Sequence, residues 1–179
     1  MIKILLAVLA WSIMGVLLAQ GSYKTYKNNQ HRFSFLYPTV WNITPSNDKD
    51  FYAICVPSTE KEKEAYDYCF DGIVFYLQFF KSSLDSTLTD QGYYKTGNDY
   101  FTNDKTSDHV KTFKIHGRGW TGIYNKNNCG ISCKDGEHHT GECDFLYFSD
   151  GKKTVCIQTV GRGFDNSVFD EIKNTFKFD

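Results

Sequence analysis

The chain has 179 residues, of which 41% are hydrophobic and 23% are charged, and its formal net charge at pH 7 is −1. A chain of this length is expected to fold as one domain with a sizeable buried core. The near-neutral charge excludes a strong electrostatic field and argues against a nucleic acid as partner.

Residues 1–21 have the pattern of a secretory signal peptide. One positive charge at Lys3 precedes an almost entirely apolar stretch, and Ala19-Gln20-Gly21 places small residues where a signal peptidase reads them. We therefore expect cleavage after Gly21, a single α+β domain over 22–179, and a secreted or periplasmic location. No second long apolar run follows, so no membrane span is expected after cleavage. An uncleaved N-terminal anchor is the alternative.

The first half of the mature chain contains apolar segments typical of β-strands. Residues 31–37 alternate aromatic and polar side chains, and Pro38 stops this strand, which resumes over 41–44. Residues 51–56 form a second apolar run. Residues 73–80 are apolar on nearly both faces, which predicts a central strand covered on both sides.

The middle of the chain predicts a helix, two loops and two strands. Residues 84–94 carry apolar side chains at helical spacing and predict a short helix, whereas 95–109 are polar and predict a surface loop. Strands are predicted over 110–115 and 120–124. Residues 125–142, which are rich in Asn, Gly and Cys, are predicted as a long loop.

The C-terminal part predicts a hairpin followed by a helix and a last strand. Residues 144–148 and 154–160 alternate as strands on either side of Ser149-Asp150-Gly151-Lys152, which is a strong turn signal. An apolar stripe predicts a helix over 167–174, and 175–178 resembles a terminal strand. The fold class is therefore predicted as α+β, an antiparallel β-sheet flanked by short helices.

The chain contains six cysteines, all beyond the predicted cleavage point: Cys55, Cys69, Cys129, Cys133, Cys143 and Cys156. An even number of cysteines in an exported chain predicts three disulfides that reinforce the fold. Cys55 with Cys69 is the favoured first pair, because this bond closes the charged 56–68 loop between two strands. The other four cysteines leave three pairings open, and Cys143 and Cys156 flank the predicted turn.

Two segments resemble the PsbP-like domain family. Residues 33–41, Phe-Ser-Phe-Leu-Tyr-Pro-Thr-Val-Trp, resemble the F-x-F-x-Y-P-x-x-W opening of these domains. The close of the chain is similar too, with a short amphipathic helix over 167–174 and then Phe176-Lys177-Phe178. The resemblance implies an α/β/α sandwich around an antiparallel sheet and a non-catalytic role in binding or assembly. The six cysteines and the 125–142 segment depart from the family pattern.

A dense cluster of possible metal ligands lies in the predicted long loop: Cys129, Cys133, His138, His139 and Cys143. In a reducing compartment these thiolates and imidazoles would suit zinc. Because an oxidising compartment pairs cysteines, disulfides are the preferred interpretation, and no metal or cofactor is predicted. His138 and His139 remain candidate binding residues, and exposed loop histidines without a ligand are the alternative.

Two arginines stand between glycines and before an aromatic residue, in Gly117-Arg118-Gly119-Trp120 and in Gly161-Arg162-Gly163-Phe164. Glycines expose backbone N–H groups, and the guanidinium offers a planar fork to a carboxylate or phosphate. Arg118, Trp120 and Arg162 are therefore candidate binding residues of an anion-recognition site. The alternative is that both segments are ordinary glycine turns at strand ends.

The sequence lacks the common motifs of catalysis: Gly-x-Ser-x-Gly, His-Glu-x-x-His and the phosphate-binding loop are all missing. We therefore predict an exported, non-catalytic binding domain whose partner is another protein, in an assembly, inhibitor or immunity-type role. One alternative is a metal-dependent or other hydrolase that uses the segment around His138 and His139. The other is a structural subunit of an envelope or photosynthetic assembly.

Overall fold

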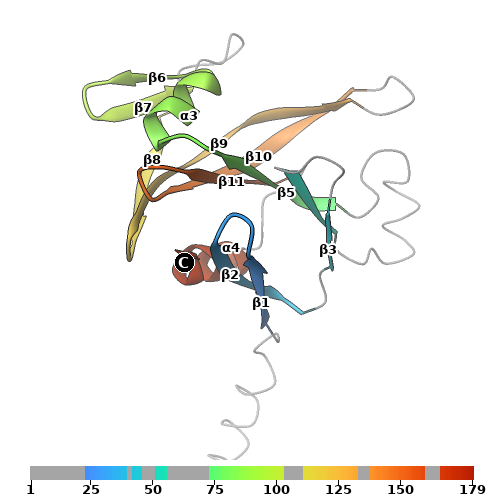
Figure 1. The fold of residues 1–179 in the computed structure, drawn as a ribbon. Coiled ribbons are helices and arrows are strands. Elements are labelled where there is room, and N and C mark those ends of the chain that lie inside the picture. Colours follow the sequence, from blue (N-terminus) through green and yellow to red (C-terminus); the bar gives the residue numbers. More distant parts are fainter. Residues whose placement is uncertain are drawn as a thin grey trace, which may run out of the picture.

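The computed structural model describes residues 23–39, 42–45, 51–55, 73–102, 111–132, 138–159 and 166–179. Within these ranges the chain forms three antiparallel β-sheets and two short helices, which are arranged in layers (Figure 1). The predicted α+β class is therefore confirmed. The predicted leader, residues 1–21, lies outside the described residues.

The largest sheet has seven strands in the order β3-β4-β5-β11-β10-β9-β8, and all of its pairs are antiparallel. The β5 strand lies inside this sheet, as predicted from its apolar sequence. The bounds of these strands are β3 (Asn42–Pro45), β4 (Phe51–Cys55), β5 (Ile73–Phe80), β8 (Phe113–Gly117), β9 (Trp120–Ser132), β10 (His138–Ser149) and β11 (Thr154–Thr159).

The two faces of the large sheet are covered by different elements. One face packs against a three-stranded sheet of order β1-β2-β12 and the C-terminal helix α4, and the other carries α3 and a small hairpin (Figure 1). The remaining bounds are β1 (Tyr23–Asn28), β2 (Phe33–Pro38), β12 (Lys177–Phe178), α4 (Asn166–Thr175), α3 (Leu84–Asp90), β6 (Tyr93–Thr96) and β7 (Asp99–Thr102).

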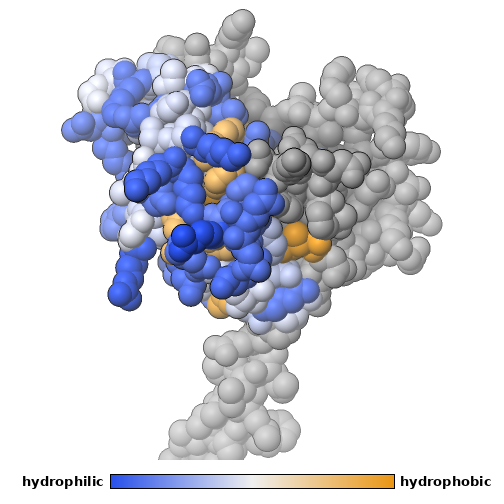
Figure 2. Space-filling model, in the orientation of Figure 1, coloured by the Kyte–Doolittle hydropathy of each residue, from blue (hydrophilic) through white to orange (hydrophobic). Residues whose placement is uncertain are grey.

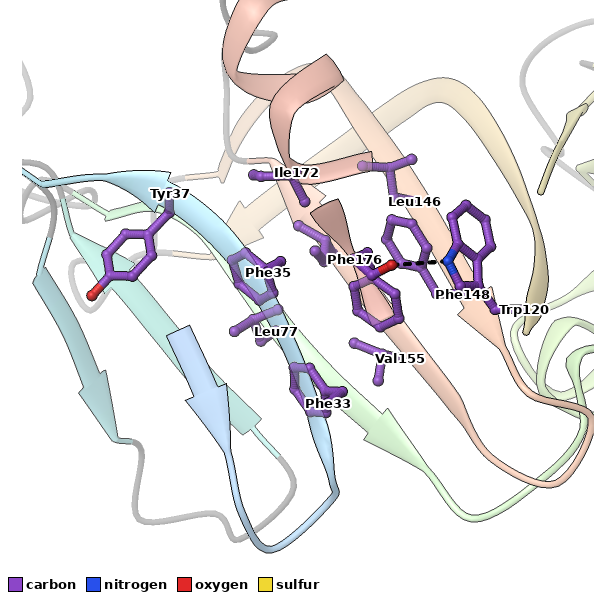
Figure 3. Close-up of a cluster of buried hydrophobic side chains, with 11 residues drawn as sticks. Phe33, Phe35, Tyr37, Leu77, Trp120, Leu146, Phe148, Val155, Ile172 and Phe176 are labelled. Atoms are coloured by element: carbon purple, nitrogen blue, oxygen red, sulfur yellow. Dashed lines mark hydrogen bonds between the residues drawn. The ribbon is translucent and has the colours of Figure 1, made fainter. Parts of the chain in front are cut away.

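The main core lies between the large sheet and the layer formed by α4 and the three-stranded sheet. Its buried members come from β2, β5, β9, β10, β11 and α4, and from the residue that follows α4 (Figure 3). Phe176 is central, because its ring stacks on Phe148 at a centroid distance of 4.0 Å. The buried members are Phe33, Phe35, Tyr37, Leu77, Trp120, Leu146, Phe148, Val155, Ile157, Ile172 and Phe176.

A second, smaller core lies on the opposite face, under α3 and the β6–β7 hairpin. Its buried members are Leu88, Tyr93, Tyr100, Ile123, Tyr147 and Cys156. The Tyr93 hydroxyl donates to Asn125 Oδ1 at 2.9 Å, which ties the hairpin to β9. The large sheet is therefore packed on both of its faces, as a central layer requires.

The described parts of two predicted loops are mostly strand in the structure. Residues 95–102 belong mostly to the β6–β7 hairpin, and the 125–142 segment forms the far arms of β9 and β10. The β9–β10 register is unbroken from Thr121–Ser149 to Ser132–His138. Cross-strand pairing therefore satisfies the backbone of these polar residues, which their sequence pattern does not signal. The predicted helix over 84–94 is also shorter and ends at Asp90.

Of the two cysteines whose side chains the structure describes, one differs from the prediction. Cys156 is a free, buried thiol, so the expectation that all six cysteines pair is wrong at this position. Its side chain packs in the second core beside Tyr147 of the neighbouring strand. Cys143 is disulfide-bonded. The favoured Cys55–Cys69 pair stays a prediction, because Cys69 lies outside the described residues.

Neither helix in the described ranges is long and apolar enough to cross a membrane.

Candidate interaction surface at the edge of the large sheet

The β8 strand is the last strand of the large sheet, so one of its edges has no neighbouring strand within the described chain (Figure 1). Four of its five residues are exposed, and Ile115 is half-buried. The exposed Arg118 follows directly in the turn to β9. We call residues 113–118 the β8 edge.

Phe113 is the exposed large hydrophobic residue of the described chain, with 65% of its surface accessible. Its ring stacks on Tyr124 at a centroid distance of 6.2 Å, and Tyr124 meets Phe169 of α4 edge-on at 4.8 Å. The Tyr124 hydroxyl donates to Asp144 Oδ1 at 2.8 Å. Because Tyr124 is held at both its ring and its hydroxyl, Phe113 is presented to solvent on a fixed support.

The face formed by α4 and the three-stranded sheet is mostly hydrophilic over its described part, and hydrophobic residues appear there only in small areas (Figure 2). Single exposed apolar residues are common on protein surfaces, so Phe113 alone says little. Its position on an outer strand is the informative feature, since an unpaired strand edge also presents backbone hydrogen-bonding groups.

The charges around the β8 edge are mainly positive. Asp99 of β7 pairs with Lys111 Nζ at 2.7 Å and with Lys114 Nζ at 3.4 Å. The hydrogen bond from Lys111 lowers the pKa of the Asp99 carboxyl, and this acid stays ionised at neutral pH. Arg118 and His116 add a further cation and an exposed imidazole. An acidic partner surface would complement this set of charges.

The structure separates the predicted binding residues Arg118 and Trp120. Arg118 is exposed in the turn, whereas Trp120 is only 5% exposed and belongs to the main core. The indole Nε1–H donates to the Phe176 carbonyl at 2.9 Å (Figure 3). The predicted contact role of Trp120 is therefore corrected to a structural one, because its ring and its N–H are both used inside the protein.

Trp120 also explains the glycine before the turn. A Cβ at Gly117 would lie 2.3 Å from the indole Cε2, which is far below a normal contact distance. Gly119 has a φ of +79°, which favours glycine. The Gly-Arg-Gly-Trp segment is thus shaped by packing and turn geometry. Arg162, the other predicted arginine, lies outside the described residues, and its role stays a prediction.

His138 and His139 begin β10, where their backbones pair with Ser132 and Ile131. Their side chains are not described, so their predicted binding role is not tested. In the part of the chain that the structure describes, no group of three or more His, Cys, Asp or Glu side chains is placed to hold a metal ion.

Sequence reasoning did not single out Phe113, Lys114 or His116. The 110–115 segment reads as an ordinary strand, in which an apolar residue is expected to face the core. Only the strand order, which places β8 at the end of the sheet, shows that these residues lie at an edge. The sequence offers one weak signal, the two lysines Lys111 and Lys114 in this short predicted strand, since charged residues are typical of edges.

No protein-family model and no curated protein matches the chain. Among solved structures, a crystal structure from Bacteroides thetaiotaomicron VPI-5482 is similar, with a TM-score of 0.51 and 16% identity over 89% of this chain and 49% of that chain. This chain thus spans about half the length of that protein. The solution structure of cyanobacterial PsbP (CyanoP) from Synechocystis sp. PCC 6803 has a TM-score of 0.47 and 10% identity, over 90% and 95% of the two chains.

The identities are low, so the comparisons concern the fold. The class that the structure defines is an α+β domain with an antiparallel sheet between two covering layers. The Bacteroides protein shares this fold. The cyanobacterial PsbP structure comes from the family that residues 33–41 and the C-terminal segment resemble. Its similarity to this chain is too low to support an argument about family membership or activity.

Proposed function

We propose that this chain is an exported, non-catalytic domain that binds another protein through the β8 edge. The observation that carries the proposal is Phe113, an aromatic ring with 65% of its surface accessible on the outermost strand of the large sheet. Aromatic residues and arginine are enriched in protein interfaces, and Arg118 lies five residues beyond Phe113. An assembly, inhibitor or immunity-type role would each use such a surface.

The export part of the proposal rests on the leader pattern of residues 1–21 and on the cysteines. The disulfide-bonded state of Cys143 supports an oxidising compartment, since cytosolic thiols are kept reduced. The mature protein would begin at Ser22 and work in the periplasm or outside the cell. Neither the hydrolase alternative nor the structural-subunit alternative has an observation of its own among the described residues.

Capture from the native host tests the binding function. Oxidised protein immobilised as bait is compared with two variants, Phe113→Ala at the β8 edge and Tyr23→Ala on β1 of the three-stranded sheet, where the ring is half-buried. We expect one stoichiometric protein partner, with affinity at least about fivefold weaker for F113A because truncation of an interface aromatic that contributes to binding costs more than about 1 kcal/mol. Equal capture by all three proteins would exclude the β8 edge as the binding surface.

A further inference from the structure

We infer that the β8 edge receives an extended segment of its partner as an additional β-strand, and that this segment alternates acidic and apolar residues. The inference rests on the proposed function, because it names how the same surface would bind and what chemistry the partner carries. Three features of the edge support it: the backbone groups it presents, the different side chains on its two sides, and its charge.

The backbone pattern follows from the register with β9. Gly117 pairs with Trp120 across the two-residue turn, and the regular register continues to Phe113 and Tyr124. The pair that flanks a two-residue turn is hydrogen-bonded, and hydrogen-bonded pairs then alternate along an antiparallel ladder. The N–H and C=O groups of Lys114 and His116 therefore point away from β9, toward the open edge.

These outward groups are available to a new strand. No backbone hydrogen bond from another segment reaches Lys114 or His116 in the part of the chain that the structure describes. The Lys114 ammonium group lies 3.4 Å from Asp99 of β7, so this side chain is drawn toward the hairpin and away from the edge. Lys114 and His116 together present two N–H donors and two C=O acceptors at the open edge. An added strand forms its backbone hydrogen bonds with alternate residues of this kind.

The two sides of the β8 edge differ in chemistry. Phe113 and Ile115 lie on the side of α4, where Phe113 stacks on Tyr124 and Ile115 packs against the main core. Lys114 and His116 alternate with them and lie on the side of the β6–β7 hairpin. In a strand added here, every second side chain would lie beside Phe113 and Ile115. The side chains between them would lie beside Lys114 and His116.

Charge complementarity selects the partner chemistry. Asp99 of the hairpin is already paired with Lys111 and Lys114, and Arg118 stands at the end of the strand. Acidic residues facing the Lys114 side would add attraction and speed association. A second copy of this chain fits less well, because self-pairing would bring the Lys114 and Arg118 cations of one edge beside those of an identical edge.

Peptide binding to the full mature protein tests the inference directly. The probe is a synthetic peptide, acetyl-Glu-Val-Glu-Tyr-Glu-Val-Glu-amide, and the control peptide has lysine in place of every glutamate. Titration followed by ¹H–¹⁵N NMR should shift the amides of Lys114 and His116, and the acidic peptide should bind at least about tenfold more tightly than the basic one.

Two variants of one residue separate backbone pairing from side-chain contact. His116→Pro removes an outward N–H and leaves the ladder to β9 intact, since proline is tolerated at a strand edge. His116→Ala keeps the N–H. We expect about tenfold weaker peptide binding for H116P and less than about threefold change for H116A. Amide spectra of both variants, compared with the unchanged protein, verify that the fold is retained.

The remaining outcomes overturn the inference in distinguishable ways. Equal binding by H116P and H116A, or equal binding of the two peptides, would exclude strand addition by an acidic segment. Self-association in sedimentation experiments that H116P abolishes would assign the edge to a second copy. If F113A lost the captured partner while H116P kept it, the proposed function would stand and strand addition alone would fail.

Discussion

Cys156 is a thiol held in a protected, neutral state. It is 4% exposed in the second core, and burial raises the pKa of Cys156 to about 12, while its hydrogen bond with Tyr147 acts in the opposite direction. A thiol becomes a nucleophile only as the thiolate, so this residue should be inert in the folded protein at physiological pH.

Alkylation tests this state. Without reductant at pH 8, iodoacetamide should leave Cys156 unmodified in the folded protein and label it after unfolding in guanidinium. Because its pKa rises from 9.0 in the unfolded chain to about 12 in the folded one, the stability it contributes is present below pH 9. That contribution is lost as the pH rises toward 12. Peptide mapping that finds Cys156 in a disulfide would contradict the structure.

Single residues also show where sequence reasoning stops. The count of six cysteines predicts complete pairing, but pairing depends on where each side chain points, and Cys156 faces Tyr147. Trp120 reads as a contact residue because it follows Gly-Arg-Gly. Its hydrogen-bond acceptor is the carbonyl of Phe176, 56 residues away, so no local pattern reveals its burial.

At the scale of elements, Lys153 joins the turn before β2 to the β10–β11 hairpin. Its Nζ donates to the carbonyls of His31 at 2.6 Å and Arg32 at 3.2 Å, and lies 4.8 Å from the centroid of the Phe178 ring. Arg32 has a φ of +56°, a conformation that few residues other than glycine adopt. The lysine therefore holds a strained turn of the small sheet against the large one.

Replacing this link should loosen the turn. We expect Lys153→Met, which keeps the aliphatic chain and removes the donors, to lower the free energy of unfolding by about 1.5 kcal/mol, the scale of hydrogen bonds to a charged group. Faster amide exchange should appear in the turn that contains His31 and Arg32. Urea denaturation and hydrogen exchange measure the two effects.

The control for this change is Lys152→Met, because Lys152 is exposed and adjacent. It should leave stability within about 0.5 kcal/mol of the unchanged protein. If the two variants were equally stable, the bonds from Lys153 would contribute nothing to holding the turn.

Elements with strong local signals are those that the sequence predicts well. Residues 33–38, 73–80 and the β10–β11 hairpin carry alternation, an apolar run or a turn signal, and the structure confirms each of them. The hairpin β6–β7 and the far arms of β9 and β10 are polar, and their pairing comes from the partner strand. Local sequence patterns do not contain that information.

At the scale of the whole molecule, the order of the strands and the packing of the layers decide which residues are exposed to a partner. The predicted antiparallel sheet with flanking short helices is present, but the sequence does not predict that β8 ends the large sheet or that a second sheet covers one face. Both features join segments far apart in the chain. The candidate surface follows from that topology, so it could not be predicted before the fold.

Phe176 connects all the parts that meet in the main core. Its ring stacks on Phe148 of the large sheet at 4.0 Å and on Phe33 of the small sheet at 5.8 Å. Its carbonyl accepts from Trp120, and its N–H donates to Ile172 at the end of α4. One residue between α4 and β12 thus contacts the two sheets and the helix that lies beside them.

Removing this ring should therefore destabilise the whole domain. Phe176→Ala is expected to lower the free energy of unfolding by about 3–5 kcal/mol, because it leaves a cavity where three elements meet, and Phe176→Leu by less. The matched control is Phe113→Ala, which deletes the same ring at the exposed β8 edge and should cost within about 0.5 kcal/mol. Urea denaturation followed by tryptophan fluorescence measures all three variants. If F176A lowered the free energy of unfolding by less than about 1 kcal/mol, the layers would hold together without this ring. If F113A lowered the free energy of unfolding by a large amount, weaker partner binding by F113A would have to be attributed to unfolding.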